Sequence, residues 1–263
     1  MERFTKEQIL AAVRERYGAV ARSQGSECGC SPGCCSASNS ADEKSRGLGY
    51  SADDVAIAPE GANLGLGCGN PQAIASLKAG ETVLDLGSGG GFDCFLAARA
   101  VGQTGRVVGV DMTADMVSLA RKNADKGGYA NVEFRLGEIE HLPAADASVD
   151  VIISNCVVNL SPDKPQVYRE AYRVLRSGGR LAISDVVASA PIPEDVEKDI
   201  AAYSACVAGA SSLDELTRML TEAGFTEIRV QPKDESRSFI REWSTEYRVE
   251  EYALSATIEA VKP

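Results

Sequence analysis

Short apolar runs alternate with longer amphipathic segments over the middle of the chain. Three of the longer segments read as helices: Phe92–Val101, Ala114–Lys126 and Lys164–Leu175. Five runs of about five residues fit buried strands: Thr82–Leu86, Arg106–Val110, Val132–Leu136, Val149–Ser154 and Arg180–Val187. Strands separated by helices of ten or more residues indicate a mostly parallel sheet with helices on both faces. The pattern therefore predicts a doubly wound α/β fold.

Different patterns flank this region. A capping box at Thr5–Gln8, followed by apolar positions at three- and four-residue steps, predicts an N-terminal helix. A loop rich in Ser, Gly and Cys extends from Ser23 to Gly49. Helices and then two strands are predicted downstream, over Asp195–Ala208, Asp214–Ala223, Phe225–Val230 and Tyr252–Ala260. We therefore divide the chain into an N-terminal part (1–70), a core (71–189) and a C-terminal part (190–263).

Composition narrows the class of function. With 27 basic and 38 acidic residues and no concentrated Lys/Arg stripe, the chain is a poor binder of nucleic acid. No apolar run approaches the ~20 residues of a membrane span, and the N-terminus lacks the apolar stretch of a signal peptide, so we expect a cytoplasmic protein. Nothing in the sequence requires more than a monomer. The single histidine, His141, excludes a multi-histidine metal site, whereas eight cysteines in a reducing compartment favour thiol or metal chemistry.

The first predicted strand runs into a glycine-rich turn, Asp85-Leu86-Gly87-Ser88-Gly89-Gly90-Gly91. Glycines at a strand-to-helix turn allow positive φ and let a ligand approach the backbone N–H groups. Phe92 stands where the dinucleotide fingerprint needs its third glycine, which argues against NAD or FAD. The second strand is followed, about twenty residues after the glycines, by Asp111, where a carboxylate accepts hydrogen bonds from both ribose hydroxyls. These residues predict a nucleoside-containing ligand without a 2′-phosphate.

From about Glu81 to Ser189, this pattern resembles the class I S-adenosylmethionine-dependent methyltransferases. The resemblance implies a seven-stranded sheet whose last two strands form an antiparallel hairpin, and S-adenosylmethionine as the cofactor with S-adenosylhomocysteine as its product. It also implies binding residues around the methionine end (Asp85, Gly87, Gly89, Gly91), at the ribose (Asp111), beside the adenine (Met112, Glu138, Ile139) and at the end of the fourth strand (Asn155).

The end of the fourth strand also indicates the methyl acceptor. Cys156 follows a parallel strand at the edge where doubly wound folds bind ligands, so we expect it near the sulfonium methyl group. No obvious general base accompanies it, and an acceptor with a free lone pair needs none. Cys68 and Cys206 lie in segments that flank the same pocket, and three thiolates without histidine suit a trigonal metalloid better than tetrahedral zinc. The alternative is that all three are small buried hydrophobic residues.

Three cysteine segments resemble those of the arsenite methyltransferases: Gly67-Cys68-Gly69, Ser154-Asn155-Cys156-Val157-Val158-Asn159-Leu160-Ser161 and Ala205-Cys206-Val207-Ala208-Gly209-Ala210. The resemblance implies that Cys68, Cys156 and Cys206 hold As(III) and that arsenite and methylarsenite are the substrates. It further implies that an upstream cysteine, Cys34 or Cys35, forms a disulfide with Cys68 during turnover. A thiol reductant, glutathione or thioredoxin, would then regenerate the enzyme.

Other interpretations stay open at this point. The loop cysteines could form a separate zinc or metalloid site, although the spacing of Cys28, Cys30, Cys34 and Cys35 is not that of a zinc finger. The chain could methylate a small organic acceptor and use its cysteines for packing. It could also be a thiol-rich metalloid-binding protein without turnover, but the complete glycine turn and Asp111 argue against that hypothesis.

Overall fold

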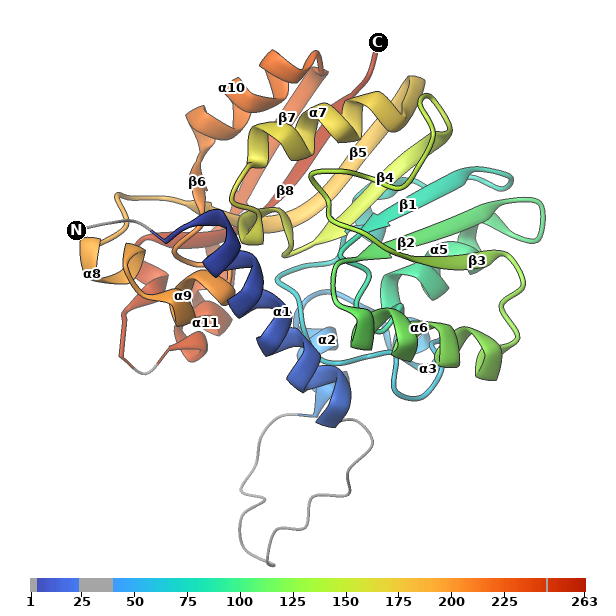
Figure 1. The fold of residues 1–263 in the computed structure, drawn as a ribbon, viewed down its shortest axis with the longest axis horizontal. Coiled ribbons are helices and arrows are strands. Elements are labelled where there is room, and N and C mark those ends of the chain that lie inside the picture. The colour runs from blue at the N-terminus through green and yellow to red at the C-terminus, as the bar shows by residue number, and fades with distance from the viewer. Residues whose placement is uncertain (1–3, 24–39, 245) are drawn as a thin grey trace, which may run out of the picture.

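A single mixed sheet organises the computed structural model, which describes residues 4–23, 40–244 and 246–263 (Figure 1). The strands lie in the order β3-β2-β1-β4-β5-β8-β7, and β6 pairs with β5 off this path. Their bounds are Thr82–Leu86 (β1), Arg106–Asp111 (β2), Val132–Leu136 (β3), Val149–Asn155 (β4), Leu175–Ala188 (β5), Ser211–Ser212 (β6), Thr226–Lys233 (β7) and Ala253–Val261 (β8).

The strand directions confirm the predicted fold class. Strands β1 to β5 are parallel to one another, β8 runs antiparallel to β5, and β7 runs antiparallel to β8. The seven strands of the main path include the expected closing hairpin, β7 and β8. The eighth strand, β6, was not predicted, because two residues carry no alternation that a sequence pattern could reveal.

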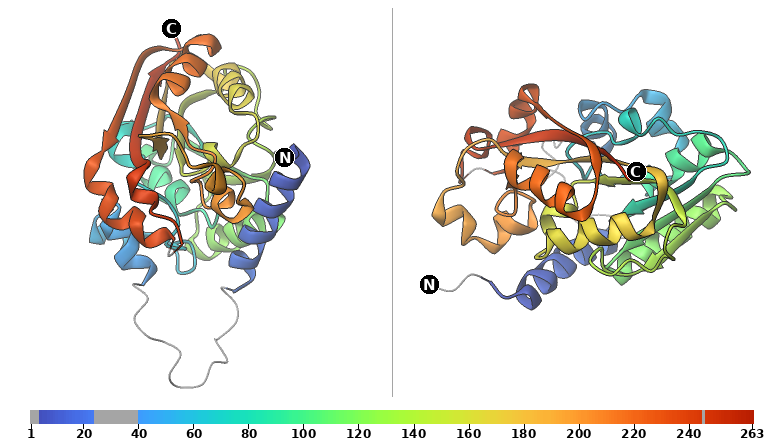
Figure 2. Two further views of the ribbon diagram at one scale, coloured as in Figure 1. Left: turned by 90° about the vertical axis from the view of Figure 1, so that its left-hand side faces the viewer. Right: turned by 90° about the horizontal axis from the view of Figure 1, so that it is seen from above.

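Helices cover both faces of the sheet (Figures 1 and 2). On one face, α7 and α10 pack side by side over Leu84, Leu86 and Ile152, and on the other α5 and α6 pack over Val83 and Val151. Among the residues described, no helix combines the length and apolar character needed to cross a membrane. The helices are α1 (Lys6–Ser23), α2 (Ala41–Gly47), α3 (Ala52–Ile57), α4 (Gln72–Ala75), α5 (Phe92–Val101), α6 (Ala114–Gly127), α7 (Lys164–Val174), α8 (Glu194–Glu197), α9 (Ile200–Ser204), α10 (Leu213–Ala223) and α11 (Arg237–Ile240).

The N-terminal helix α1 packs against α6 and α9 (Figure 1). Its capping box is present, since the Gln8 amide donates to Thr5 Oγ1 over 3.2 Å and Thr5 N donates to Gln8 Oε1 over 2.9 Å. Ion pairs attach α1 to three other segments: Arg22 to Asp115, Arg14 to Glu138 and Lys6 to Asp163. These pairs are largely exposed, so the apolar face of α1 provides most of its attachment.

The prediction of one helix over Asp195–Ala208 was wrong. The chain forms two short helices instead, because Asp199 interrupts the segment and caps α9 by accepting a hydrogen bond from Ala201 N over 2.8 Å. Helix α9 ends at Ser204, so Cys206 lies in a turn. That turn leads into β6 and then into α10, which begins with a Ser212–Glu215 capping box.

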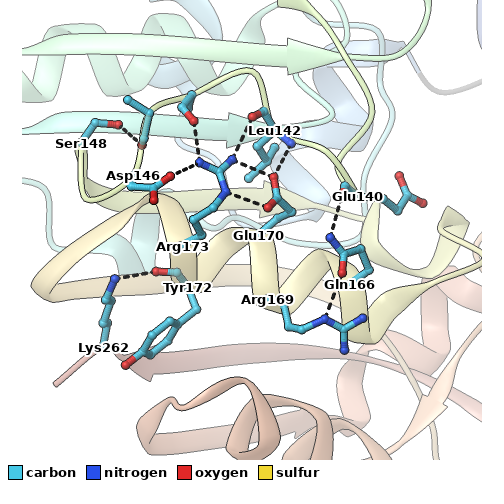
Figure 3. Close-up of polar contacts among 12 residues, drawn as sticks. Glu140, Leu142, Asp146, Ser148, Gln166, Arg169, Glu170, Tyr172, Arg173 and Lys262 are labelled. Atoms are coloured by element: carbon cyan, nitrogen blue, oxygen red, sulfur yellow. Dashed lines mark hydrogen bonds and ion pairs between the residues drawn. The ribbon is translucent and has the colours of Figure 1, made fainter.

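Side chains of α7 fix the connection between β3 and β4 (Figure 3). Arg173 donates to the carbonyl oxygens of Leu142 and Ala144 over 3.0 and 2.9 Å. Gln166 donates from Nε2 to the Glu140 carbonyl oxygen over 3.1 Å. This connection contains no helix or strand, and it carries Glu138 and Ile139, two of the residues expected beside the adenine, so α7 positions part of the predicted site.

Candidate functional site

A cavity of about 1070 Å³ lies at the carboxyl ends of β1, β2 and β4. Residues of α1, the segment 62–67 and the segment 238–243 complete its wall. The volume is at the upper end of the range for small-molecule sites, so the cavity has room for a nucleoside-sized ligand and a second, smaller one. This is the edge at which the sequence predicted the site.

The glycine turn and Asp111 face each other across one end of the cavity. Gly89, at φ +50°, donates its N–H to Asp111 Oδ2 over 3.0 Å, and Thr113 N donates to Oδ1 over 2.8 Å. At Gly87 (φ +69°), a Cβ would lie 2.3 Å from the side chain of Val157. Glycine is therefore required at Gly87 both by the backbone conformation and by the close approach of the chain after β4.

The other residues predicted to bind the cofactor fall into two groups. Asp85, Met112, Ile139 and Asn155 line the cavity. Gly91 and Glu138 do not: a Cβ on Gly91 would meet Phe134 and Phe95, and the Glu138 carboxylate pairs with Arg14 of α1. The structure thus gives Gly91 a packing role and places Glu138 in the attachment of α1.

Asn155 connects the cavity to the segment that carries Cys68. Its Oδ1 accepts from Cys68 N over 3.0 Å, and its Nδ2 donates to the Gly69 carbonyl oxygen over 2.8 Å and to Tyr50 Oη over 3.0 Å. Tyr50 in turn donates to Asp93 Oδ1 over 2.8 Å. The sequence did not single out Tyr50 or Asp93, although an acidic residue in the first turn after a glycine loop is a detectable signal.

Three carboxyl groups gather around the glycine turn, those of Asp85 and Asp93 buried and that of Asp111 partly buried. Burial raises the pKa of Asp93 to about 6 against the lowering effect of its hydrogen bonds, and burial together with the charge of Asp93 raises the pKa of Asp85 well above its usual value. Burial also raises the pKa of Asp111. None of the ion pairs in the described part of the chain involves these three groups, so a cationic ligand would provide the missing countercharge.

The three predicted thiols meet beside the cavity. Sγ of Cys68, Sγ of Cys156 and a carboxylate oxygen of Asp185 lie within 4.8 Å of one another. Cys206 Sγ donates to the Cys156 carbonyl oxygen over 2.9 Å, which places the third thiol beside Cys156. The other residue proposed for catalysis, Cys34 or Cys35, lies outside the described residues, as do Cys28 and Cys30.

Cys156 and Cys206 have φ values of +59° and +66°. A left-handed conformation costs a residue with a Cβ roughly 1 kcal/mol or more, and glycine would adopt it without strain. Among the non-glycine residues described, only Ser76, Ala147 and Glu227 share it. Two thiols that meet are therefore both held in strained turns.

The thiols are poor acids in the free chain. Burial raises the pKa of Cys68 to about 11. The pKa of Cys156 is lowered by interaction with Cys206, but interaction with Cys68 and burial raise it by more. The pKa of Cys206 is raised both by interaction with Cys156 and by burial. The three groups are therefore protonated near neutral pH and lose protons only when a thiophilic centre binds.

Helix α1 places Tyr17 in the wall of the cavity. Burial raises the pKa of the Tyr17 hydroxyl, and the charges of Cys206, Cys156 and Asp111 raise it further. The sequence identified Tyr17 only as part of an apolar helix face. Its role in the cavity depends on how α1 docks, which no local pattern indicates.

The comparisons with known proteins agree with this geometry. A methyltransferase-domain family model matches residues 77–224. An arsenite methyltransferase of Halobacterium salinarum is 56% identical to this chain over 98% of it and 67% of the archaeal protein. Another, of Aquipseudomonas alcaligenes, is 45% identical over 62% of this chain and 49% of its own length, so the chain spans about half of that relative.

A crystal structure of an arsenic(III) S-adenosylmethionine methyltransferase from Chlamydomonas reinhardtii superposes with a TM-score of 0.63 at 33% identity. The match covers 86% of this chain and 75% of the algal one. Family model, sequence relatives and solved structure point the same way. The chain belongs to the arsenite methyltransferase family, within the class I S-adenosylmethionine-dependent methyltransferases.

Proposed function

We propose that this chain transfers the methyl group of S-adenosylmethionine to trivalent arsenic held by Cys68, Cys156 and Cys206, giving methylated arsenicals. The observation that carries the proposal is the meeting of three thiols, distant in sequence, at the edge of the cavity that the glycine turn opens onto. Thiolates prefer soft centres, and three of them match the trigonal coordination of As(III). Arsenite and methylarsenite are the proposed substrates.

The residues of the cavity fit the cofactor. The glycine turn presents backbone that a side chain would obstruct, as the 2.3 Å approach of a Cβ at Gly87 to Val157 indicates. Asp111 is held toward the turn and suits ribose hydroxyls. Asp85 and Asp93 line the end that suits a cationic amino acid group, whose charge would favour their ionised forms, and Met112 and Ile139 supply apolar surface for a base. When bound, the cofactor supplies a methyl group on a positively charged sulfur.

The chain's own contribution to the reaction is positioning. Each thiol replaces one hydroxide of arsenite, and its proton leaves with that hydroxide as water. The arsenic lone pair takes no part in the three As–S bonds and stays available to attack. Because the attacking atom carries no proton, no general base is needed in the transfer step. Asn155 holds the Cys68 segment against the end of β4, so the arsenic site and the cofactor end share one support.

We extend the proposal to regeneration of the enzyme. Methyl transfer leaves arsenic formally pentavalent. The thiol of Cys34 or Cys35 then attacks the Cys68 sulfur, its proton is released, and the As–S bond breaks with its electron pair returning to arsenic, which becomes trivalent again. Glutathione or thioredoxin reduces the resulting disulfide. We also propose that the chain works as a monomer, in a reducing compartment such as the cytoplasm. Support for this part comes from the family resemblance, since the loop cysteines lie outside the described residues.

The test is to incubate the reduced protein anaerobically with arsenite, S-adenosylmethionine and a thiol reductant, then to separate the arsenic species by chromatography with elemental detection. We expect methylarsenicals from the wild type and none from Cys68→Ser, Cys156→Ser or Cys206→Ser. Cys94→Ser is the matched control, because Cys94 is buried on α5 and its thiol donates to Asp85 rather than to the cluster. Full methylation by Cys156→Ser, or an organic acceptor methylated instead, would overturn the proposal.

A further inference from the structure

Asp185 of β5 lies beside the thiols and has no role in the function proposed above. It is 1% exposed, and one of its carboxylate oxygens is within 4.8 Å of the Sγ atoms of Cys68 and Cys156. An acidic group is unexpected here, since negative charge opposes the formation of thiolates, and it contributes to the raised pKa values of all three cysteines. Because its charge opposes thiolate formation, we infer that this charge favours another step of the reaction.

Hydrogen bonds fix the position of the Asp185 carboxylate. Oδ1 accepts from Val186 N over 2.7 Å and from Asn159 Nδ2 over 3.0 Å, and Oδ2 accepts from Val158 N over 2.9 Å. Two of these donors belong to the turn that directly follows Cys156. The carboxylate thus keeps a constant position relative to that thiol without rearranging during a reaction.

In the described part of the chain the Asp185 carboxylate accepts hydrogen bonds and belongs to no ion pair. Lys164 shares with it the wall of a void of about 10 Å³, but the Lys164 ammonium donates to the Gly209 carbonyl oxygen and to Ser211 Oγ. All three hydrogen bonds to the Asp185 carboxylate come from N–H donors, and such donors favour the ionised form of the group.

We propose that Asp185 stabilises the positive charge that appears on arsenic during methyl transfer, an inference that rests on the proposed function. The arsenic lone pair forms the new As–C bond, and the methyl C–S bond breaks with its electron pair going to sulfur. One unit of positive charge therefore leaves sulfur and appears on arsenic, with no proton, oxidant or reductant involved. A fixed carboxylate beside the thiols interacts more strongly with the transition state than with the neutral As(III) thiolate, which accelerates the step.

The test compares wild type with Asp185→Asn in a single-turnover reaction. Reduced full-length protein is loaded with arsenite, mixed with S-adenosylmethionine, quenched at intervals and assayed for methylarsenicals. We expect the transfer rate to fall about 10- to 100-fold, while arsenite binds as tightly as before or tighter because a repulsive charge has gone. Asp150→Asn is the control, since Asp150 lies at the amino end of β4 and donors other than the thiols hold it, namely Thr82 N and Arg176.

A second pair of variants guards against a folding defect. Asp185→Glu and Asp185→Gln share their size and differ in charge, so we expect the Glu variant to be about tenfold faster. Equal rates within this pair, or a rate in Asp185→Asn within twofold of wild type, would overturn the inference. The inference would also be overturned if Asp185→Asn bound both arsenite and cofactor more weakly and recovered the wild-type rate at saturating concentrations. A wild type that makes no methylarsenicals would overturn the proposed function itself, and the inference with it.

Discussion

Both ends of the cavity contain residues with positive φ values, but the residue types that adopt this conformation differ. At the cofactor end, Gly87 and Gly89 take up positive φ values, and the ligand-facing surface is backbone. At the thiol end, Cys156 and Cys206 take up positive φ values although each has a Cβ. The difference follows from chemistry, because N–H groups recognise a nucleotide-like ligand whereas a metalloid needs sulfur. At the thiol end the strain is accepted because the reaction needs the side chain.

Gly87→Ala should have the largest effect at the cofactor end. A methyl group there would lie 2.3 Å from Val157 and would impose a left-handed conformation on alanine, so cofactor affinity should fall at least 100-fold. Isothermal titration with S-adenosylmethionine measures the change. Gly102→Ala is the matched control, since Gly102 also has positive φ but nothing lies within 4 Å of its added Cβ. Unchanged cofactor affinity in Gly87→Ala would show that the turn does not contact the ligand.

The acidic pocket predicts a pH dependence at the same end. Asp93, with a pKa near 6, becomes protonated as the pH falls, so affinity for the cationic cofactor should drop about tenfold between pH 7 and pH 5. The Asp93→Asn variant should bind more weakly and lose most of this dependence. Without ligand the sign reverses: because folding raises this pKa, the free energy of unfolding attributable to Asp93 decreases as the pH rises from about 4 to about 6. A flat binding profile in the wild type would contradict the assignment.

At the thiol end, glycine should stabilise the chain where cysteine is strained. Cys156→Gly should be about 1 kcal/mol more stable than Cys156→Ala, although both should be inactive, because only glycine relaxes at φ +59°. Chemical denaturation measures both variants. The same pair at Cys68, which is not among the positive-φ residues, should show the opposite order. If the Gly and Ala variants had the same order of stability at both positions, backbone strain at Cys156 would be contradicted.

The smallest effect is expected at Glu138. Its carboxylate pairs with Arg14 and is absent from the cavity wall, so Glu138→Gln should change cofactor affinity less than twofold and stability by about 0.5 kcal/mol. Isothermal titration with S-adenosylmethionine measures the cofactor affinity, and thermal unfolding measures the stability. A loss of tenfold or more in affinity would instead support the cofactor-binding role predicted from the sequence.

Local patterns were sufficient for the cofactor end. Strand β1, the glycine turn and the start of α5 are consecutive, and Asp111 follows the next strand, so spacing alone placed them together. The division of the chain into parts 1–70, 71–189 and 190–263 stays a prediction, although the last part supplies β7 and β8 to the same sheet as the core.

The amino-acid sequence by itself determined the doubly wound sheet and the position of the glycine turn, since periodicity and short motifs are encoded in neighbouring residues. The three cysteines were selected through the family resemblance, and their role stays a proposal. Only the tertiary structure decided that Cys68, Cys156 and Cys206 meet, that Asp185 lies among them and that Glu138 faces Arg14. Those relations depend on the docking of segments that are distant in the sequence, and the burial that results raises the pKa values of the site.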